Sequence, residues 1–217
     1  MRILITSGPT RAPLDAVRFL SNRSTGRFGT LLAEEALRNG MGVTMIYGIG
    51  SETPQAQARL KLLPIETNQD LEKTLRRELI KTKYDAVIHA MAVLDYRPAR
   101  VVAGKRGSRD GDWLIRLIPT AKVIRKIKRW APRTLLIGFK LESSGRPVRE
   151  LVGRATRLVQ ESGADYVVAN YLSEGSDDQH RGYLVGRDGT VIRKTVGKKN
   201  LAREIIRREL SGVWRLP

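Results

Sequence analysis

Short apolar runs alternate with amphipathic segments along most of the chain. Runs in which nearly every residue is apolar predict strands that are buried on both faces, as in parallel sheets. Segments whose apolar residues recur every three or four positions predict helices with one buried face. The expected strands are residues 2–7, 43–47, 60–63, 85–92, 134–139 and 166–169. The expected helices are residues 25–39, 70–83, 122–130, 149–161 and 200–210.

Residues that favour caps and turns refine this pattern. Asn68 is expected to cap the helix 70–83, in which Ile80 is expected to face inward with the leucines. The segment 9–20 is expected to be a loop, and residues 113–118 alternate as in a half-exposed strand. An Asp-Gly turn predicts an antiparallel hairpin over residues 182–194.

Strands that alternate with helices predict an α/β protein with a Rossmann-like, mostly parallel sheet flanked by helices. The late antiparallel hairpin is an appendage to that sheet. Ligands of such sheets bind beyond the carboxyl ends of the strands. We therefore expect the site in the segments that follow Ser7, Tyr47, Met91, Phe139 and Asn170.

Length and composition suit one globular domain over residues 1–217, with 41% hydrophobic and 29% charged residues. No stretch approaches the roughly 20 apolar residues of a membrane span, and the first apolar run is too short for a signal peptide. The absence of cysteine excludes disulfides, and His89 and His180 are too few for a histidine metal cluster. We expect a cytoplasmic protein that does not associate with membranes.

The charge balance is strongly basic, with 40 Lys+Arg against 22 Asp+Glu and a net charge of +18. Such a charge attracts polyanions. It would fit a nucleic-acid-binding α/β module, or an enzyme for phosphorylated substrates in a host with arginine-rich proteins. The basic residues are spread along the chain, including residues 122–129 and 198–208, and form no block of like charge. This spread favours the enzyme and leaves nucleic-acid binding as the alternative.

Two common nucleotide motifs are missing. No glycine-rich turn ends in Gly-Lys-Ser or Gly-Lys-Thr, so a P-loop is excluded. Gly48 and Gly50 follow the second expected strand, but position 53 is threonine and no acidic residue ends that strand. These departures count against a nicotinamide-dependent oxidoreductase, which is a third and weaker hypothesis.

A different polar segment begins the helix 25–39. Ser24, Thr25, Gly26 and Gly29 surround its expected start, and Asn22 precedes them. Free amides at a helix N-terminus and nearby hydroxyl groups suit an anion, and glycines let phosphates approach the backbone. The same residue types also cap helices and pack them against sheets, so both interpretations stay open on this segment alone.

Further motifs follow this segment in a fixed order over nearly the whole chain. The motifs are Gly8-Pro9-Thr10-Arg11, Leu14-Asp15, Val17-Arg18-Phe19-Leu20-Ser21-Asn22 and Ser24 to Gly29, then Ala92-Val93-Leu94-Asp95-Tyr96-Arg97-Pro98, then Trp130-Ala131-Pro132, Ile137-Gly138-Phe139-Lys140-Leu141-Glu142 and Val167-Val168-Ala169-Asn170. Together they resemble the phosphopantothenate-cysteine ligase (phosphopantothenoylcysteine synthetase) family of coenzyme A biosynthesis. The chain looks like the stand-alone ligase, without a flavin-containing decarboxylase half.

The resemblance implies a two-step reaction. The carboxylate of 4'-phosphopantothenate attacks the α-phosphate of a nucleoside triphosphate, accompanied by Mg²⁺, and releases pyrophosphate. The amine of cysteine then attacks the acyl-nucleotide. The implied binding residues are Gly8, Ser24, Gly26, Gly29, Phe139 and Asn170 for the nucleotide and Asn22, Ala92 and Asp95 for the pantothenate part, with Asn22 also near the acyl-phosphate.

The resemblance also implies a homodimer. Arg18 would bind substrate in the neighbouring subunit, and the hairpin 182–194 would help to form the dimer. Residues 101–112 occupy the place of a flap, expected to be mobile, in which Lys105 would supply the closing cation. A solvated loop lysine is the alternative for Lys105, and Arg106 could substitute for it.

Two departures from the common bacterial pattern affect the choice of nucleotide. Further flap lysines are replaced by Arg106, Gly107 and Ser108, and Ile118-Pro119-Thr120 stands where fused enzymes tend to have Asn-Pro-Asp. Bacterial members usually take CTP and eukaryotic ones ATP. We expect CTP rather than ATP, with both still open.

Some other residues have simpler interpretations. His89 lies in an apolar strand and is expected to be a packed side chain rather than a catalyst. Trp113 and Trp130 are expected in the core or at an interface. Asp95, at the end of the second motif, could instead cap a turn.

Overall fold

A central eight-stranded sheet organises the part of the chain that the computed structural model describes, which is residues 1–109, 111–143, 145, 147–172 and 177–209. In sheet order, the strands are β12 (Val191–Val196), β11 (Arg181–Val185), β10 (Tyr166–Leu172), β9 (Leu135–Ser143), β6 (Ala86–His89), β1 (Arg2–Ser7), β4 (Gly42–Gly48) and β5 (Leu60–Ile65). The strands from β10 to β5 pair in parallel, whereas β11 runs antiparallel to both β10 and β12. The expected mostly parallel α/β sheet with a late hairpin is therefore confirmed.

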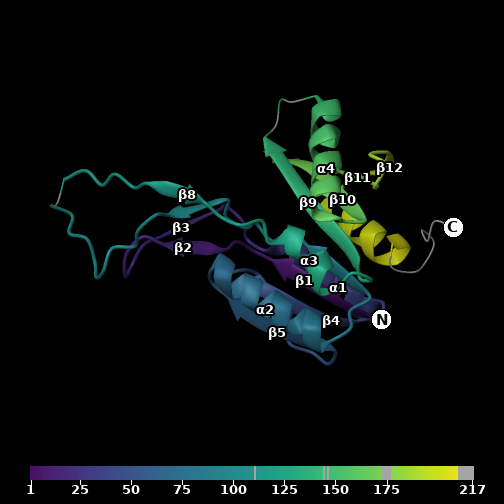
Figure 1. Cartoon of the computed structure of the whole chain (residues 1–217). Helices are drawn as coiled ribbons and strands as arrows, with labels where there is room; N and C mark the ends of the chain where they lie inside the picture. The colour runs from purple at the N-terminus through teal and green to yellow at the C-terminus, as the bar shows by residue number, and fades with distance from the viewer. Residues whose placement is uncertain (110, 144, 146, 173–176, 210–217) are drawn as a thin grey trace.

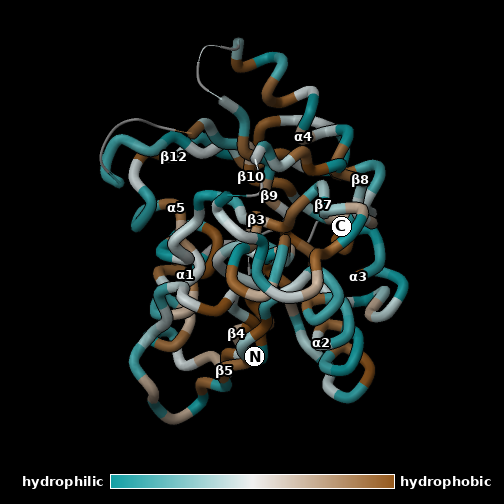
Figure 2. The backbone as a smooth tube through the Cα atoms, turned by 90° about the vertical axis from the view of Figure 1, so that its left-hand side faces the viewer, coloured by the Kyte–Doolittle hydropathy of each residue, from teal (hydrophilic) through white to brown (hydrophobic). Residues whose placement is uncertain are grey.

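Helices cover both faces of this sheet (Figure 1). The helices α1 (Arg27–Arg38) and α5 (Lys198–Glu204) lie on one face, and α2 (Asn68–Lys81), α3 (Ile124–Trp130) and α4 (Val148–Ser162) lie on the other. Figure 2 looks along the sheet from its carboxyl edge and shows α1 and α5 opposite α2 and α3.

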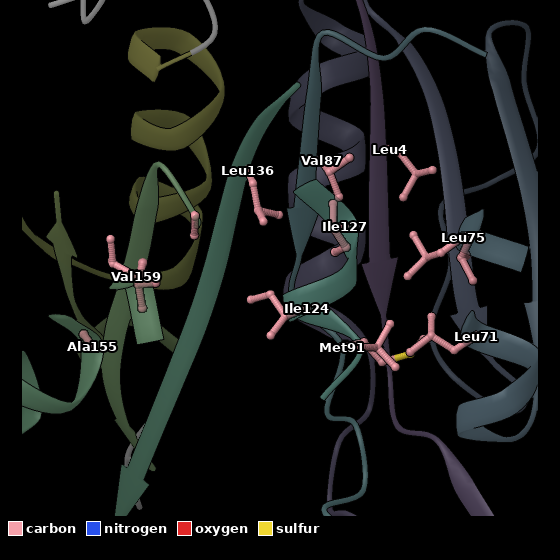
Figure 3. Close-up of a cluster of buried hydrophobic side chains, with 14 of the residues drawn as sticks. Leu4, Leu71, Leu75, Val87, Met91, Ile124, Ile127, Leu136, Ala155 and Val159 are labelled. Carbon is pink, nitrogen blue, oxygen red and sulfur yellow. The ribbon is translucent and has the colours of Figure 1, made fainter. Parts of the chain in front are cut away.

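The alternation of side chains along β1 divides the core into two layers. Ile3 and Ile5 pack with α1 and α5, while Leu4 points to the opposite layer. There Leu4 belongs to a cluster that includes Leu75 of α2 and Ile127 of α3 (Figure 3). Burial on both faces explains the apolar runs at the centre of the parallel strands, such as residues 3–5 of β1.

Two ribbons form an arm beyond the carboxyl edge of the sheet (Figure 1). One ribbon pairs β2 (Arg11–Pro13) with β3 (Phe19–Ser21), and the other pairs β7 (Tyr96–Pro98) with β8 (Leu117–Pro119). The expected loop over 9–20 is thus wrong for the residues in β2 and β3. The expected strand over 113–118 is also wrong in extent, because only Leu117–Pro119 has a pairing partner.

The start of α2 differs from the sequence prediction. Thr67, not Asn68, is the N-cap, and Thr67 forms a capping box with Asp70. Asn68 instead donates its amide to the main-chain oxygen of Leu94 at 2.7 Å. Ile80 is 63% exposed, because the adjacent Leu79 takes the core-facing position and successive helix positions point about 100° apart.

The chain ends in less regular helix than expected. α5 passes at Ile205–Glu209 into a π-helical turn, and residue 210 of the expected helix lies outside the described residues.

Earlier in the chain, α4 ends at the left-handed Gly163. The described helices include none that is long and apolar enough to cross a membrane.

Candidate functional site

The first part of the site is the close approach of α1 to the end of β1. Gly26 precedes α1 in a left-handed conformation (φ 82°), and its carbonyl accepts a 2.9 Å hydrogen bond from Ser7 Oγ. A Cβ at Gly29 would lie 2.1 Å from Ser7 Oγ. Glycine at position 29 therefore lets the helix N-terminus reach the carboxyl edge of the sheet, next to the half-buried Ser24. The N-cap Gly26 has no side chain to cap the helix, and Thr25 Oγ1 accepts from the amide of Arg27 at 3.3 Å.

The loop after β4 supports this helix start. Gly8 has a φ of 74°, and a Cβ there would lie 1.9 Å from Ser51 Oγ. The amide of Glu52 donates to Thr25 O at 2.8 Å. Sequence reasoning missed Ser51, whose buried hydroxyl has no hydrogen-bond partner among the described residues. Gly48 and Gly50, in the turn before Ser51, are the sequence signal that could have identified this residue.

The second part of the site joins the first motif to the segment after β6. Asn22 Nδ2 donates to the main-chain oxygens of Ala92 at 3.2 Å and Val93 at 3.4 Å. Main-chain bonds from Thr10 to Ala92 O and from Ala92 to Gly8 O hold the same segments together. Two residues expected to hold the pantothenate part are thus adjacent, and the Asn22 side chain is exposed to solvent.

Asp95 lies next along this segment. Its carboxylate forms a 2.5 Å ion pair with Lys122, and its main-chain oxygen accepts a bond from the amide of Thr120. The Asp95 side chain is 59% exposed. It is therefore accessible to a ligand as well as joined to the segment before α3. Sequence reasoning missed Lys122, because its proximity to Asp95 depends on the fold.

The predicted nucleotide residues of β9 and β10 lie on the α1 side of the site or at its edge. The ring of Phe139 packs edge-on against Phe28 of α1, with centroids 5.5 Å apart. The amide of Asn170 lies 3.3 Å from His180 Nε2, and Asn170 Oδ1 is buried without a partner in the described ranges. Burial and the nearby Lys198 lower the pKa of His180, which favours a neutral ring.

An ion-pair chain joins α1 to α5 beside this pair. Asp177 accepts from Arg27 Nε at 2.6 Å and from Lys198 Nζ at 2.8 Å, and these contacts lower the pKa of the Asp177 carboxyl. Arg27 also contacts Glu52. Arg27 and, through Asp177, Lys198 thus bring two cations to this side of α1. Arg27 lies within the predicted nucleotide segment, but sequence reasoning assigned neither cation a role of its own.

Arg18 and Lys105 are not brought to these residues within the chain. Both lie on the arm, where the Arg18 guanidinium bonds to Asp15 at 2.9 Å and to Arg106 O at 3.0 Å. The three residues of β3 lie between Arg18 and Asn22, so four extended Cα-to-Cα steps place the two residues about 13 Å apart. The exposed Lys105 ammonium forms no hydrogen bond or ion pair within the described part of the chain.

His89 and Trp130 lie where their interpretation placed them, whereas Trp113 is half-buried on the arm and belongs to neither core cluster of the described residues. His89 is buried with its Nδ1 2.8 Å from Thr6 Oγ1, and burial lowers its pKa to about 4. Trp130 packs partly buried against the core. Trp113, on the arm, has the guanidinium groups of Arg18 and Arg106 over its ring.

The basic residues of α3 and its approach form ion pairs. Each of four cations in this segment contacts a carboxylate; the pairs are Lys122–Asp95, Arg125–Glu161, Lys126–Glu72 and Lys128–Asp165. This segment therefore offers less free positive charge than its sequence suggests. Metal ligands are not evident either, since the described residues contain no group of three or more histidine, cysteine or carboxylate side chains suited to a metal ion.

Comparison with known proteins relates the whole arrangement to one family. Residues 1–211 match the DNA/pantothenate metabolism flavoprotein C-terminal domain. The Coenzyme A biosynthesis bifunctional protein CoaBC of Thermococcus kodakarensis is 33% identical over 204 residues, covering 94% of this chain and 49% of that protein. The chain thus spans about half the length of the relative it matches.

Solved structures support the same assignment. The DNA/pantothenate metabolism flavoprotein of Streptococcus pneumoniae has a TM-score of 0.89 at 28% identity, covering 97% of this chain and 99% of that one. The C-terminal domain of a Coenzyme A biosynthesis bifunctional protein CoaBC has a TM-score of 0.76 at 30% identity, covering 98% of this chain and 95% of that one. The chain belongs to the DNA/pantothenate metabolism flavoprotein C-terminal domain family.

Proposed function

We propose that this chain is a phosphopantothenate-cysteine ligase. Membership of a family whose relatives are named for coenzyme A biosynthesis supports the reaction class. The observation that carries the proposal is the contact of Asn22 with Ala92, beside a glycine-lined helix start. This arrangement brings an amide donor for an acyl-phosphate close to an N-terminus suited to nucleotide phosphates.

The proposed reaction has two displacements. A carboxylate oxygen of 4'-phosphopantothenate bonds to the α-phosphorus of the nucleotide, and the bond to pyrophosphate breaks. The cysteine nitrogen then bonds to the acyl carbon, loses a proton, and the nucleoside monophosphate leaves. The first step brings together two anions, so hydrogen-bond donors and cations lower its barrier.

For the nucleotide, we propose that Gly8, Ser24, Gly26 and Gly29 surround the phosphates and that Phe139 and Asn170 meet the other end. Asn170 Oδ1, which has no hydrogen-bond partner among the described residues, supplies an acceptor for a ligand donor. CTP is the expected nucleotide and ATP the alternative. Mg²⁺ enters with the triphosphate, whose own oxygens supply ligands for it.

For the acyl substrate, we propose that Asn22, Ala92 and Asp95 hold the pantothenate part and that Lys105 closes the site. Arg18 acts in the neighbouring subunit of a homodimer, to which the β11–β12 hairpin also contributes. The distance along β3 and the bonds that retain Arg18 on the arm support action outside its own site. Co-purified heterodimers of Asn22→Asp and Arg18→Gln chains then regain activity, because one of their two sites is intact; a heterodimer as inactive as its parents refutes this arrangement.

The ligase is tested by pyrophosphate release with CTP and ATP in parallel, omitting one component at a time. Release is expected only with 4'-phosphopantothenate, nucleotide and Mg²⁺ present. Cysteine is then expected to convert the acyl-nucleotide to 4'-phosphopantothenoylcysteine. No turnover with either nucleotide would refute the proposal.

A further inference from the structure

The arm contains a fully buried carboxylate that the reaction described above does not use. The side chain of Asp15 has no exposed surface. One oxygen, Oδ1, accepts from the amides of Val17 at 2.9 Å and Arg18 at 2.8 Å. The other, Oδ2, accepts from Arg18 Nη1 at 2.9 Å and from the amide of Arg106 at 3.2 Å.

The two oxygens have different tasks. The Oδ1 bonds shape a local turn of the kind that aspartate often forms with the amides that follow it. That turn does not need Oδ2. This oxygen instead connects the side chain of Arg18 to the amide of Arg106, which lies 91 residues after Asp15. A buried carboxylate is costly unless its oxygens are paired. The Oδ2 contacts therefore depend on both Arg18 and Arg106 being in place.

Neighbouring bonds complete the junction on both sides of Lys105. The amide of Ala16 donates to Gly104 O at 3.0 Å, and Arg18 Nη2 donates to Arg106 O at 3.0 Å. The chain is thus held immediately before and immediately after Lys105. The guanidinium groups of Arg18 and Arg106 both lie over the ring of Trp113, 5.4 and 5.5 Å from its centroid.

We infer that Asp15 is a positioning residue that holds Arg18 and the Lys105 segment as one unit, so that both cations serve the same active site, that of the neighbouring subunit. The inference rests on the proposed function for the roles of the two cations. Asp15 itself touches no substrate. It fixes the backbone at Lys105 relative to the Arg18 guanidinium, while the Lys105 ammonium stays free to meet charge in the site.

The kinetic test uses Asp15→Asn, Lys105→Gln and the double variant. Asparagine keeps one acceptor oxygen and replaces the other by a donor, which opposes Arg18 or the amide of Arg106. We expect Asp15→Asn to lower kcat by about 10- to 100-fold, the range expected for misplaced groups, with little change in the KM for nucleotide. The kcat of the double variant is expected within about threefold of that of the slower single variant. The reason is that Asp15→Asn already displaces the Lys105 ammonium that Lys105→Gln removes.

The control is Asp165→Asn, at the opposite edge of the sheet. Asp165 likewise accepts a main-chain amide, from Leu136, and pairs with Lys128 and Arg187. Replacement of Asp165 is expected to lower stability without changing kcat. The kcat of Asp165→Asn combined with Lys105→Gln should therefore equal that of Lys105→Gln alone. An unchanged kcat in Asp15→Asn, or independent effects of Asp15 and Lys105, would overturn the inference.

A second readout does not require turnover. Limited trypsin digestion of the full chain reports local opening of the backbone through the rate of cleavage after Lys105 and Arg106. Asp15→Asn is expected to accelerate these cleavages at least about tenfold relative to Asp165→Asn, and equal rates would refute the junction even if the ligase proposal also failed. If Asp15→Asn does not fold, Asp15→Glu tests the same point, because it keeps the charge but displaces the oxygens; wild-type cleavage and kcat in that variant would contradict the inference.

Discussion

Asn22 Nδ2 donates a hydrogen bond to the main-chain oxygen of Ala92 across 70 residues of sequence. The bond connects the polar segment before α1 to the segment after β6, at the carboxyl edge of the sheet. Asn22 is exposed, so its amide is accessible to a ligand. This residue pair is where we expect the carboxylate and the α-phosphate to meet.

Replacing Asn22 separates the effect of charge from the effect of a lost donor. Asn22→Ala removes the amide, and Asn22→Asp also adds a negative charge beside two anionic reactants. We expect kcat to fall about 100- to 1,000-fold in Asn22→Ala, as for removal of a transition-state donor, and further in Asn22→Asp. Single-turnover pyrophosphate release measures both; equal activity of Asn22→Asp and wild type would remove Asn22 from the chemistry.

The close contact at Gly29 predicts opposite outcomes for two glycine-to-alanine changes. At Gly29 the added Cβ would meet Ser7 Oγ at 2.1 Å, so α1 must shift away from the site. We expect a loss of about 1–3 kcal/mol of unfolding free energy and weaker nucleotide binding. At the exposed helical Gly153 an added Cβ would meet no atom of a neighbouring element within 4 Å. Alanine there is expected to raise the unfolding free energy by about 0.5–1 kcal/mol. Urea denaturation and nucleotide titration check both; a neutral Gly29→Ala would contradict the contact.

Lys105→Gln is expected to affect turnover more than binding. A cation that meets charge only as it develops lowers the barrier without strengthening the ground state. We expect kcat to fall about 10- to 100-fold while the nucleotide Kd changes by less than about threefold. The exposed Lys81 of α2, replaced in the same way, should change neither value. If the Lys105→Gln variant keeps the wild-type kcat, as the Lys81 control should, Lys105 is a solvated loop residue.

Buried His89 predicts that stability falls in mild acid. The folded pKa is lowered to about 4 from an ordinary value of 6.5, so the unfolded chain binds the proton first as pH falls. Stability from this group is complete above pH 6.5 and is lost progressively toward pH 4. Between pH 7.5 and 5.0 we expect a loss of about 2 kcal/mol from His89.

Urea denaturation of His89→Asn at the same two pH values checks this assignment. The variant should lose about 2 kcal/mol less than wild type on acidification, because its side chain does not titrate. His180, whose pKa is also lowered, still contributes in the variant. Equal losses in both proteins would show that His89 is not the titrating group.

Much of the sheet follows directly from local sequence. The strand β1 contains an apolar run over residues 3–5 and is buried from Ile3 to Ser7, and α4 combines an amphipathic repeat with a glycine at its end. The Asp188-Gly189 turn likewise predicts the β11–β12 hairpin, with Gly189 at a φ of 82°. These elements carry their determinants within their own residues.

The arm and part of the site have determinants that are distant in sequence. The ribbon strands β2 and β7 are three residues long and have no periodic signal. His180 and Lys122 acquire their partners, and Asp15 its contact with Arg106, only when separate elements meet. The resemblance predicted Asn22, Ala92 and Asp95 as site residues, whereas the charged groups around them became evident only in the structure.

Transfer of oxygen from the acid to the nucleotide tests the central claim most directly. 4'-Phosphopantothenate labelled with ¹⁸O in its carboxylate is incubated with cysteine, Mg²⁺, the protein and CTP or ATP. Attack of the carboxylate on the α-phosphorus predicts one ¹⁸O in each nucleoside monophosphate formed together with 4'-phosphopantothenoylcysteine. Formation of product with unlabelled monophosphate would contradict activation through an acyl-nucleotide, and formation of no product with either nucleotide would contradict the ligase itself.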